Sequence, residues 1–220
     1  MTAAADVLGR LRGLADPARL AGMARVGAGG ADTLGVTVAE LRTLARELGR
    51  DHELAAGLWA SGVHEARILA SMVEDPAAVD EEQLDAWAAG LDSWDVCDQV
   101  CQNLVRHTPH AWSRAPAWSA RPEPFVKRAG FAVMAGLAVA DGRSGDERFE
   151  PFLRAVAEHA DDDRPVVRKG ASWALRQIGK RSPGLRERAV GVAQELRSGG
   201  RGARWVATDV LRELQRRAPR

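Results

Sequence analysis

Signals that start and stop α-helices recur at short intervals along this chain, and their spacing constrains the fold more than any other feature. Thr37 and Glu40 form a capping box before an apolar run, and Gly49 follows that run as a helix-ending residue. Together the signals predict helices over 41–48, 51–59, 64–73, 80–89, 94–106, 125–140, 147–160, 166–179, 185–197 and 201–216, with two shorter ones before residue 27. Three prolines predict an irregular segment over 110–124. No run shows the period-two alternation of a β-strand.

A faint internal repeat groups these helices into pairs. The segment 168–176 aligns with 204–212 at an offset of 36 residues, and 127–134 aligns with 168–175 at an offset of 41. Offsets near 40 are typical of HEAT repeats, in which each unit is a pair of helices. The sequence therefore predicts an all-α fold with a single domain over 1–220. We expect an α-solenoid of about six HEAT-like helical hairpins that form a curved superhelix.

Charge is distributed unevenly along the chain. The formal net charge is +1, which alone argues against a general nucleic-acid binder. The segment 164–220, however, holds 15 Lys and Arg against 4 Asp and Glu, a balance of +11. The segment 74–98 holds 9 Asp and Glu and no Lys or Arg, a balance of −9. Such asymmetry is expected of a protein with one basic face.

Other features exclude several classes of protein. The longest apolar run, 131–140, is half of the roughly twenty residues that a membrane helix needs, and the N-terminus lacks the apolar core of a signal peptide. Cys97 and Cys101 lie four residues apart on one predicted helix, which predicts two buried thiols in a reducing, cytoplasmic setting. The five His show no metal-ligand spacing, and Ser/His/Asp and glycine-rich phosphate motifs are absent. We therefore expect no metal and no other cofactor.

One carboxylate on the predicted helix that carries both Cys residues lacks an ordinary structural explanation. The two Cys lie on its apolar stripe, whereas Trp94 and Asp98, four residues apart, share a face at the border of that stripe. Asp92 and Asp95 are explained as acids at the helix N-terminus. Asp98 lies past the first turn, so it is a candidate functional carboxylate. A buried salt bridge to an Arg is the structural alternative.

A second candidate site lies on the predicted helix 166–179. Trp173 lies well off the apolar stripe of this helix, and its helical neighbours include the cations Lys169, Arg176 and Lys180. An aromatic side chain framed by three cations is typical of a groove that contacts a phosphate backbone. Packing of Trp173 on the next repeat is the structural alternative.

Five stretches of the sequence together resemble one known protein family. They are 35–42, 58–70, 93–98, 126–130 and 167–176, and they follow the family's order over most of the chain. The family is the AlkD-type DNA alkylation repair family, the HEAT-like repeat DNA glycosylases.

This resemblance implies an enzyme that removes cationic N3- or N7-alkylated purines from double-stranded DNA. It implies that Asp98 is the catalytic carboxylate and that Trp94 and Trp173 flank the backbone at the lesion. It also implies that Arg128 contacts phosphate, and that the damaged base is not inserted into a pocket. We expect these four residues to line one concave surface, and we expect the protein to act as a monomer.

Two alternatives to a glycosylase remain open. The chain contains no Tyr, and Val36 precedes Thr37 where characterised family members carry Gln. A non-catalytic protein that binds damaged or distorted DNA is therefore the second hypothesis, and a HEAT-repeat scaffold for protein interactions is the third. The basic segment 164–220 favours both DNA hypotheses over the scaffold.

Overall fold

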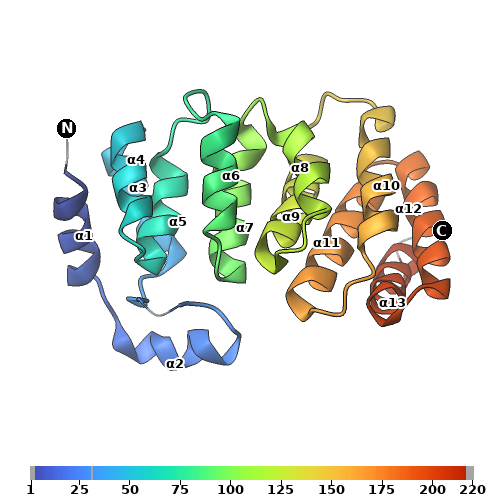
Figure 1. Cartoon of the computed structure of the whole chain (residues 1–220), viewed down its shortest axis with the longest axis horizontal. Coiled ribbons are helices and arrows are strands. Elements are labelled where there is room, and N and C mark those ends of the chain that lie inside the picture. Colours follow the sequence, from blue (N-terminus) through green and yellow to red (C-terminus); the bar gives the residue numbers. More distant parts are fainter. Residues whose placement is uncertain (1–2, 31, 217–220) are drawn as a thin grey trace. The chain divides into compact units, whose positions relative to one another are not determined.

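The computed structural model describes residues 3–30 and 32–216 and forms two compact units, 1–109 and 110–220 (Figure 1). Every regular element in the described ranges is a helix, and no strand occurs among them. The all-α prediction is therefore confirmed. No helix within this described part of the chain has the length and apolar character needed to cross a membrane. The single domain over the whole chain stays a prediction.

Unit 1 contains seven α-helices in its described residues. They are α1 (Ala4–Gly13), α2 (Pro17–Arg25), α3 (Val38–Leu48), α4 (His52–Ala60), α5 (His64–Val73), α6 (Glu81–Ala89) and α7 (Trp94–Asn103), and the short 3-10 helix η1 (Val105–His107) follows them. Side chains cap the starts of four of these α-helices, α2, α3, α4 and α6. The predicted capping box is confirmed, because Thr37 and Glu40 each accept a hydrogen bond from the other's backbone N–H. Asp51 and Asp80 cap α4 and α6 with one such bond each.

α5 is the central helix of unit 1, and α2 is its most peripheral one. α5 contacts α1, α3, α4 and α7, and eight of its ten residues are buried. In contrast, none of the nine residues of α2, all of them described, is buried. Figure 1 shows α2 running crosswise to the other helices of the unit. The position of α2 and of the segment that follows it therefore depends on few apolar contacts.

Unit 2 is built around two long helices. Its elements are α8 (Ala111–Ser119), α9 (Pro124–Ala140), η2 (Asp146–Phe149), α10 (Glu150–His159), α11 (Pro165–Arg181), α12 (Pro183–Glu195), η3 (Leu196–Ser198) and α13 (Arg201–Arg216). α9 packs between α8 and α11, and α11 also packs against α12 and α13. Phe131, Phe149 and Phe152 fill the core of the unit. This stacking of neighbouring helices is the arrangement of a HEAT-like repeat.

The prediction of an irregular segment over 110–124 is wrong, because α8 occupies most of it. Pro116 lies inside α8 and cannot donate to the carbonyl of Trp112. The helix nevertheless forms because its packed face is mostly apolar, with Trp118 only 4% exposed. Pro124 is the first residue of α9, where a missing N–H has no intrahelical partner to lose.

Two glycines of unit 2 lie where helices meet, and one of them, Gly130, is required for a close approach. A Cβ atom on Gly130 would lie 2.4 Å from the backbone nitrogen of Ser119 and 2.6 Å from the carbonyl oxygen of Ala115. A Cβ atom on Gly170 would lie 3.5 Å from the Cβ atom of Phe131. The backbones of α8 and α9 therefore touch at Gly130, and a side chain there would force them apart.

Candidate functional site

The candidate carboxylate Asp98 lies on α7, at the edge of its buried face. The buried residues of α7 are Val96, Cys97, Val100 and Cys101, which confirms the predicted stripe. Both Cys are free and buried, as expected. Trp94 and Asp98 are half-buried and lie one turn apart. Since Asp98 is the fifth residue of α7, its carboxylate lies beyond the first turn that N-terminal acids stabilise.

The indole ring of Trp94 is oriented by a hydrogen bond to a distant segment. Its Nε1–H donates to the carbonyl oxygen of Val26 at 3.2 Å. Val26 is the C-cap residue of α2, and its own side chain is 64% exposed. The start of α7 is therefore bound to the end of α2, and the orientation of the Trp94 ring depends on where that end lies.

Asp95, next to Trp94, forms an ion pair that the sequence does not reveal. The Nε2 atom of His64, on α5, lies 2.8 Å from the Oδ2 atom of Asp95. Burial disfavours the charged imidazolium, but the hydrogen bond and the negative charge of Asp95 outweigh it, so the pKa of His64 is raised. Burial opposes the charge on Asp95 as well, yet the bond with His64 lowers the pKa of the Asp95 carboxyl. Both groups are therefore charged over the mildly acidic range.

The loop before α7 is held by Arg67 of α5. The guanidinium of Arg67 donates to the carbonyl oxygen of Gly90 and to the carboxylate of Asp92, each at 3.2 Å. It also lies 5.3 Å from the ring centroid of Trp59, which stacks on Trp87 at 4.3 Å. The first residues of α5 thus contact both the loop that leads into α7 and the first turn of α7 itself.

The position of Arg128 differs from the sequence-based expectation. Arg128 was expected to line a surface that binds DNA, but it is only 7% exposed. The reason is that α9 packs between two helices and is buried on most of its circumference. The Nη1 atom of Arg128 donates to the carbonyl oxygen of Val166 at 2.7 Å. Contact of Arg128 with a phosphate stays a prediction.

Trp173 is half-buried on α11, off the helix's buried stripe as predicted. Of the three cations around it, Lys169 is exposed and makes no ion pair with any residue among those described. Arg176 and Lys180 are paired with carboxylates of α13. Arg176 lies 3.1 Å from Asp209. Two of the three cations around Trp173 are therefore paired with carboxylates, and Lys169 is the exposed one.

These ion pairs belong to a ladder of polar contacts between α11 and α13. The rungs on α11 follow every fourth residue, namely Arg168, Ser172, Arg176 and Lys180. Their partners on α13 are Trp205, Asp209 and Glu213. Arg168 lies over the ring of Trp205 at 4.8 Å, Ser172 donates to Asp209 at 2.6 Å, and Arg176 and Lys180 both pair with Glu213. A spacing of four places all rungs on one helical face, so the ladder fixes the register of the two helices.

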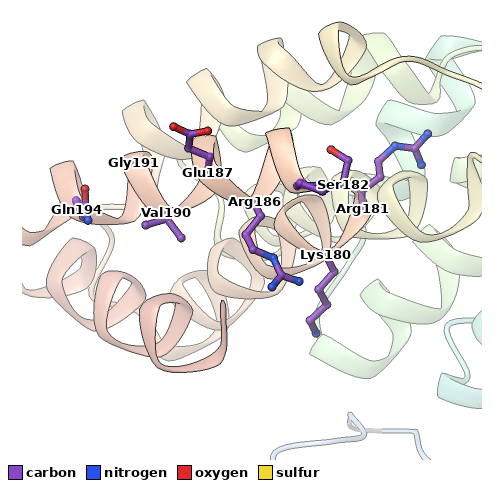
Figure 2. A pocket seen from close by; sticks show the side chains of 9 residues that line it. Lys180, Arg181, Ser182, Arg186, Glu187, Val190, Gly191 and Gln194 are labelled. Carbon is purple, nitrogen blue, oxygen red and sulfur yellow. The ribbon is translucent and has the colours of Figure 1, made fainter. Parts of the chain in front are cut away.

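An open groove of about 790 Å³ runs from the end of α11 along α12 (Figure 2). Lys180 and Arg186 extend on one side of it, whereas the guanidinium of Arg181 points away. Arg181 is held by backbone carbonyl oxygens, including that of Ser144 at 2.8 Å, and by the ring of Phe149 at 4.4 Å. The groove is therefore partly basic, but its cations also have structural partners.

The predicted site residues belong to two different units. Trp94 and Asp98 lie in unit 1, whereas Arg128, Trp173 and the cations of α11 lie in unit 2. Their expected convergence on one concave surface stays a prediction. No group of three or more His, Cys, Asp or Glu side chains in the described ranges could hold a metal ion.

Comparison with known proteins agrees with this arrangement. The family model described as DNA alkylation repair enzyme matches residues 7–216. The chain belongs to this family. One solved structure, described as "A new family of proteins related to the HEAT-like repeat DNA glycosylases with affinity for branched DNA structures", matches with a TM-score of 0.80. The match covers 98% of this chain and 95% of the other at 20% sequence identity, and it shows the HEAT-like fold. No curated protein matches the chain.

The stretch 58–70, one of the five that resemble the DNA alkylation repair family, connects several elements of unit 1. This stretch forms the end of α4 and most of α5. Its residues His64, Glu65 and Arg67 supply the contacts with the start of α7 and with the segment before α3. The stretch that carries part of the resemblance therefore coincides with the part of unit 1 that contacts Asp95 and the loop before α7.

Proposed function

We propose that this protein is a DNA glycosylase that hydrolyses the N-glycosidic bond of cationic N3- or N7-alkylated purines in double-stranded DNA. The observation that carries the proposal is the position of Asp98 on α7, half-buried and one turn from Trp94, in a chain that belongs to the DNA alkylation repair enzyme family. In this proposal Asp98 is the catalytic carboxylate. No metal or other cofactor takes part.

The chemistry of a cationic lesion suits a site with one carboxylate. When the bond from the sugar C1′ atom to the purine nitrogen breaks, its electron pair moves to the purine, which leaves as a neutral base. No general acid is therefore needed. The sugar becomes an oxocarbenium-like cation that a nearby carboxylate stabilises. Water then adds to C1′ and loses a proton, and Asp98 orients that water.

The aromatic side chains assist at the same stage. The face of Trp94 attracts positive charge on the sugar or on the alkylated purine, which is worth on the order of 0.5–2 kcal/mol for one ring. We propose the same role at the DNA backbone for Trp173. The damaged base does not need to enter a pocket, because the attacked bond lies at the edge of the duplex.

The DNA backbone is contacted mainly by unit 2 in this proposal. Lys169 is the strongest candidate, since it is an exposed cation one helical turn before Trp173. Arg128, Arg176 and Lys180 contribute positive potential, although each has a structural partner in the protein. We further propose that the protein acts as a monomer in the cytoplasm.

Release of free base is the decisive measurement. Wild-type protein is incubated in excess with duplex DNA that contains a single N7-methylguanine, and the released base is quantified over time against undamaged duplex. A chelator in both reactions tests the absence of a metal. Base release from the damaged duplex alone is the expected result. No release above the spontaneous rate of this labile lesion contradicts the proposal.

A second function, binding of branched or distorted DNA without catalysis, is favoured by one observation. The similar solved structure is described as having affinity for branched DNA structures. The absence of Tyr from this chain also separates it from characterised glycosylases of the type. Tight binding of a four-way junction without any base release from alkylated duplex selects this second function.

A further inference from the structure

Two adjacent residues at the start of α5, His64 and Glu65, are buried although both are ionisable. Their exposed fractions are 3% and 1%. Ionisable groups are seldom buried so deeply unless they are paired, because removal from water disfavours the charge. Neither residue takes part in the proposed reaction, so their burial needs another explanation.

Glu65 holds the segment that leads into α3. One carboxylate oxygen accepts the backbone N–H of Leu34 at 2.9 Å, and the other accepts that of Gly35 at 2.7 Å. Gly35 has a φ of +81°, and a Cβ atom there would lie 2.3 Å from the carbonyl oxygen of Asp16. This backbone conformation therefore excludes a side chain at position 35, and the two hydrogen bonds that Glu65 accepts stabilise it.

His64 holds the same segment from a second direction. Its backbone N–H donates to the carbonyl oxygen of Asp32 at 2.8 Å, while its ring pairs with Asp95 on α7. Asp95 also accepts the backbone N–H of Gly29 at 3.5 Å, and Trp94 donates to Val26. The described residues between Val26 and Gly35 are thus bound to the starts of both α5 and α7.

We propose that His64 and Glu65 form a clamp that positions the reactive face of α7. The clamp consists of the hydrogen bonds that join His64 to Asp32 and Asp95, and Glu65 to Leu34 and Gly35. Because none of the described residues of α2 is buried and its C-cap Val26 is 64% exposed, apolar packing contributes little to holding the end of α2. The carbonyl that orients the Trp94 ring belongs to Val26. His64 and Glu65 are therefore positioning residues for Trp94 and, one turn later, for Asp98.

This inference rests on the proposed glycosylase function for its catalytic readout, but it also has a readout that needs no activity. The full chain is prepared as wild type, His64→Ala, His64→Gln and Asp95→Asn. The matched control is His52→Ala. His52 is the first residue of α4, as His64 is of α5, and it pairs with buried Glu74 at the same distance of 2.8 Å, but it has no part in the clamp.

The first measurement is hydrogen exchange of the Trp94 indole N–H and of the Gly35 amide, followed by NMR. Exchange in His64→Ala should be about tenfold faster or more at both sites, because the local opening costs less. The His52→Ala control should leave both rates unchanged. Unchanged exchange in His64→Ala overturns the clamp, whether or not the protein is a glycosylase.

The second measurement is single-turnover base release, with duplex affinity and thermal melting measured in parallel. His64→Ala should lower the rate about ten- to a hundredfold, as expected for a displacement near 1 Å at the reacting groups, with affinity within about twofold of wild type. His64→Gln should recover much of the rate, because its side-chain N–H can still donate to Asp95. Asp95→Asn is the second test if His64→Ala does not fold.

The outcomes separate the two proposals. A wild-type protein without base release refutes the glycosylase, and hydrogen exchange then decides the clamp alone. An active wild type with a His64→Ala rate no lower than that of His52→Ala refutes the positioning role, even where exchange becomes faster. Loss of thermal stability alone, equal in the two His variants, refutes it as well.

Discussion

The two units use charged side chains in different ways. In unit 1, buried Glu65, buried His64 and half-buried Asp95 hold one irregular segment, and Glu65 accepts its hydrogen bonds from backbone N–H groups. In unit 2, cations of α11 pair with carboxylates of α13 in a ladder that joins two regular helices. The first arrangement fixes a local backbone position and the second fixes a helix register. In the proposed function, the chemistry belongs to unit 1 and the contact with the DNA backbone mainly to unit 2.

The largest effect is expected from Asp98→Asn. The positive charge on the sugar develops only as the bond breaks, so the carboxylate acts on the transition state. We expect single-turnover base release to fall on the order of 10²–10³-fold, while affinity for alkylated duplex stays nearly unchanged. A melting curve measured alongside distinguishes a structural Asp98, because loss of a buried ion pair lowers the melting temperature strongly.

The control for this variant is Asp85→Asn on α6, an exposed residue with the same change of charge. It should leave base release unaffected. Full activity of Asp98→Asn together with a large loss of stability would falsify the catalytic role of unit 1.

Helix packing in unit 2 should be the next most sensitive feature. Gly130→Ala places a methyl group where the backbones of α8 and α9 touch, so we expect a loss of about 1–3 kcal/mol in the free energy of unfolding. Denaturant unfolding measures it. Gly191→Ala is the matched control, because its Cβ atom meets nothing within 4 Å on α12. That change should raise stability by up to about 1 kcal/mol through helix propensity. Equal losses in both variants would contradict the close approach.

The proposed DNA grip of unit 2 is tested at its exposed cation. Lys169→Glu should weaken duplex binding about three- to tenfold regardless of the DNA sequence. The slope of log affinity against log salt concentration should also become shallower by about one or more. Arg154→Glu on α10 is the matched control, since it reverses one exposed charge elsewhere in the unit. Reversal of Arg176 is less informative, because it also places a carboxylate against Asp209. Equal weakening by Lys169→Glu and Arg154→Glu would show a nonspecific charge effect.

The smallest expected effect is a dependence of stability on pH through the ion pair of His64 and Asp95 in unit 1. Because the pKa of His64 is raised above 6.5, its contribution to stability is full below that value and is lost as pH rises through the folded pKa. Because the pKa of Asp95 is lowered from 3.8, its contribution is present above that value and is lost as pH falls through the folded pKa. The pair therefore stabilises most between the two ordinary values.

Urea unfolding of wild type and His64→Gln at pH 5.5 and pH 9 measures this effect, with exchange of the Gly35 amide as the local probe. The advantage of wild type should be larger at the lower pH, where the imidazolium is present. The same difference at both pH values would mean that charge on His64 has no role in the clamp.

Much of the fold was predictable, because helix limits depend on local chemistry. The capping box at Thr37 and the side-chain caps at Asp51 and Asp80 specify where helices start through contacts between residues only three positions apart. The segment around Pro116 was predicted wrongly, because burial of Trp118 against the rest of unit 2 outweighs a rule that considers proline alone.

The candidate site was only partly predictable. The half-buried positions of Trp94 and Asp98 follow from helical periodicity. The partners of His64 and Arg176 lie 31 and 37 residues further along the chain, and periodicity within one helix gives no information about them. Burial of Arg128 was missed for a related reason, since α9 has helices on two sides. The one sequence signal for the contacts of His64 and Glu65 was their position in the stretch 58–70, which carries part of the resemblance to the family. The five His show no metal-ligand spacing, so a metal site does not explain this pair of residues.

The two residues of the clamp should leave different records in the evolution of related sequences. His64 depends on a side chain, so a replacement at position 64 should be accompanied by a replacement at Asp95, and the two positions should vary together. Glu65 binds backbone N–H groups, which every residue except proline provides. Position 34 should therefore accept any residue except proline, whereas position 65 should remain Glu. Position 35 should remain glycine because of its positive φ angle.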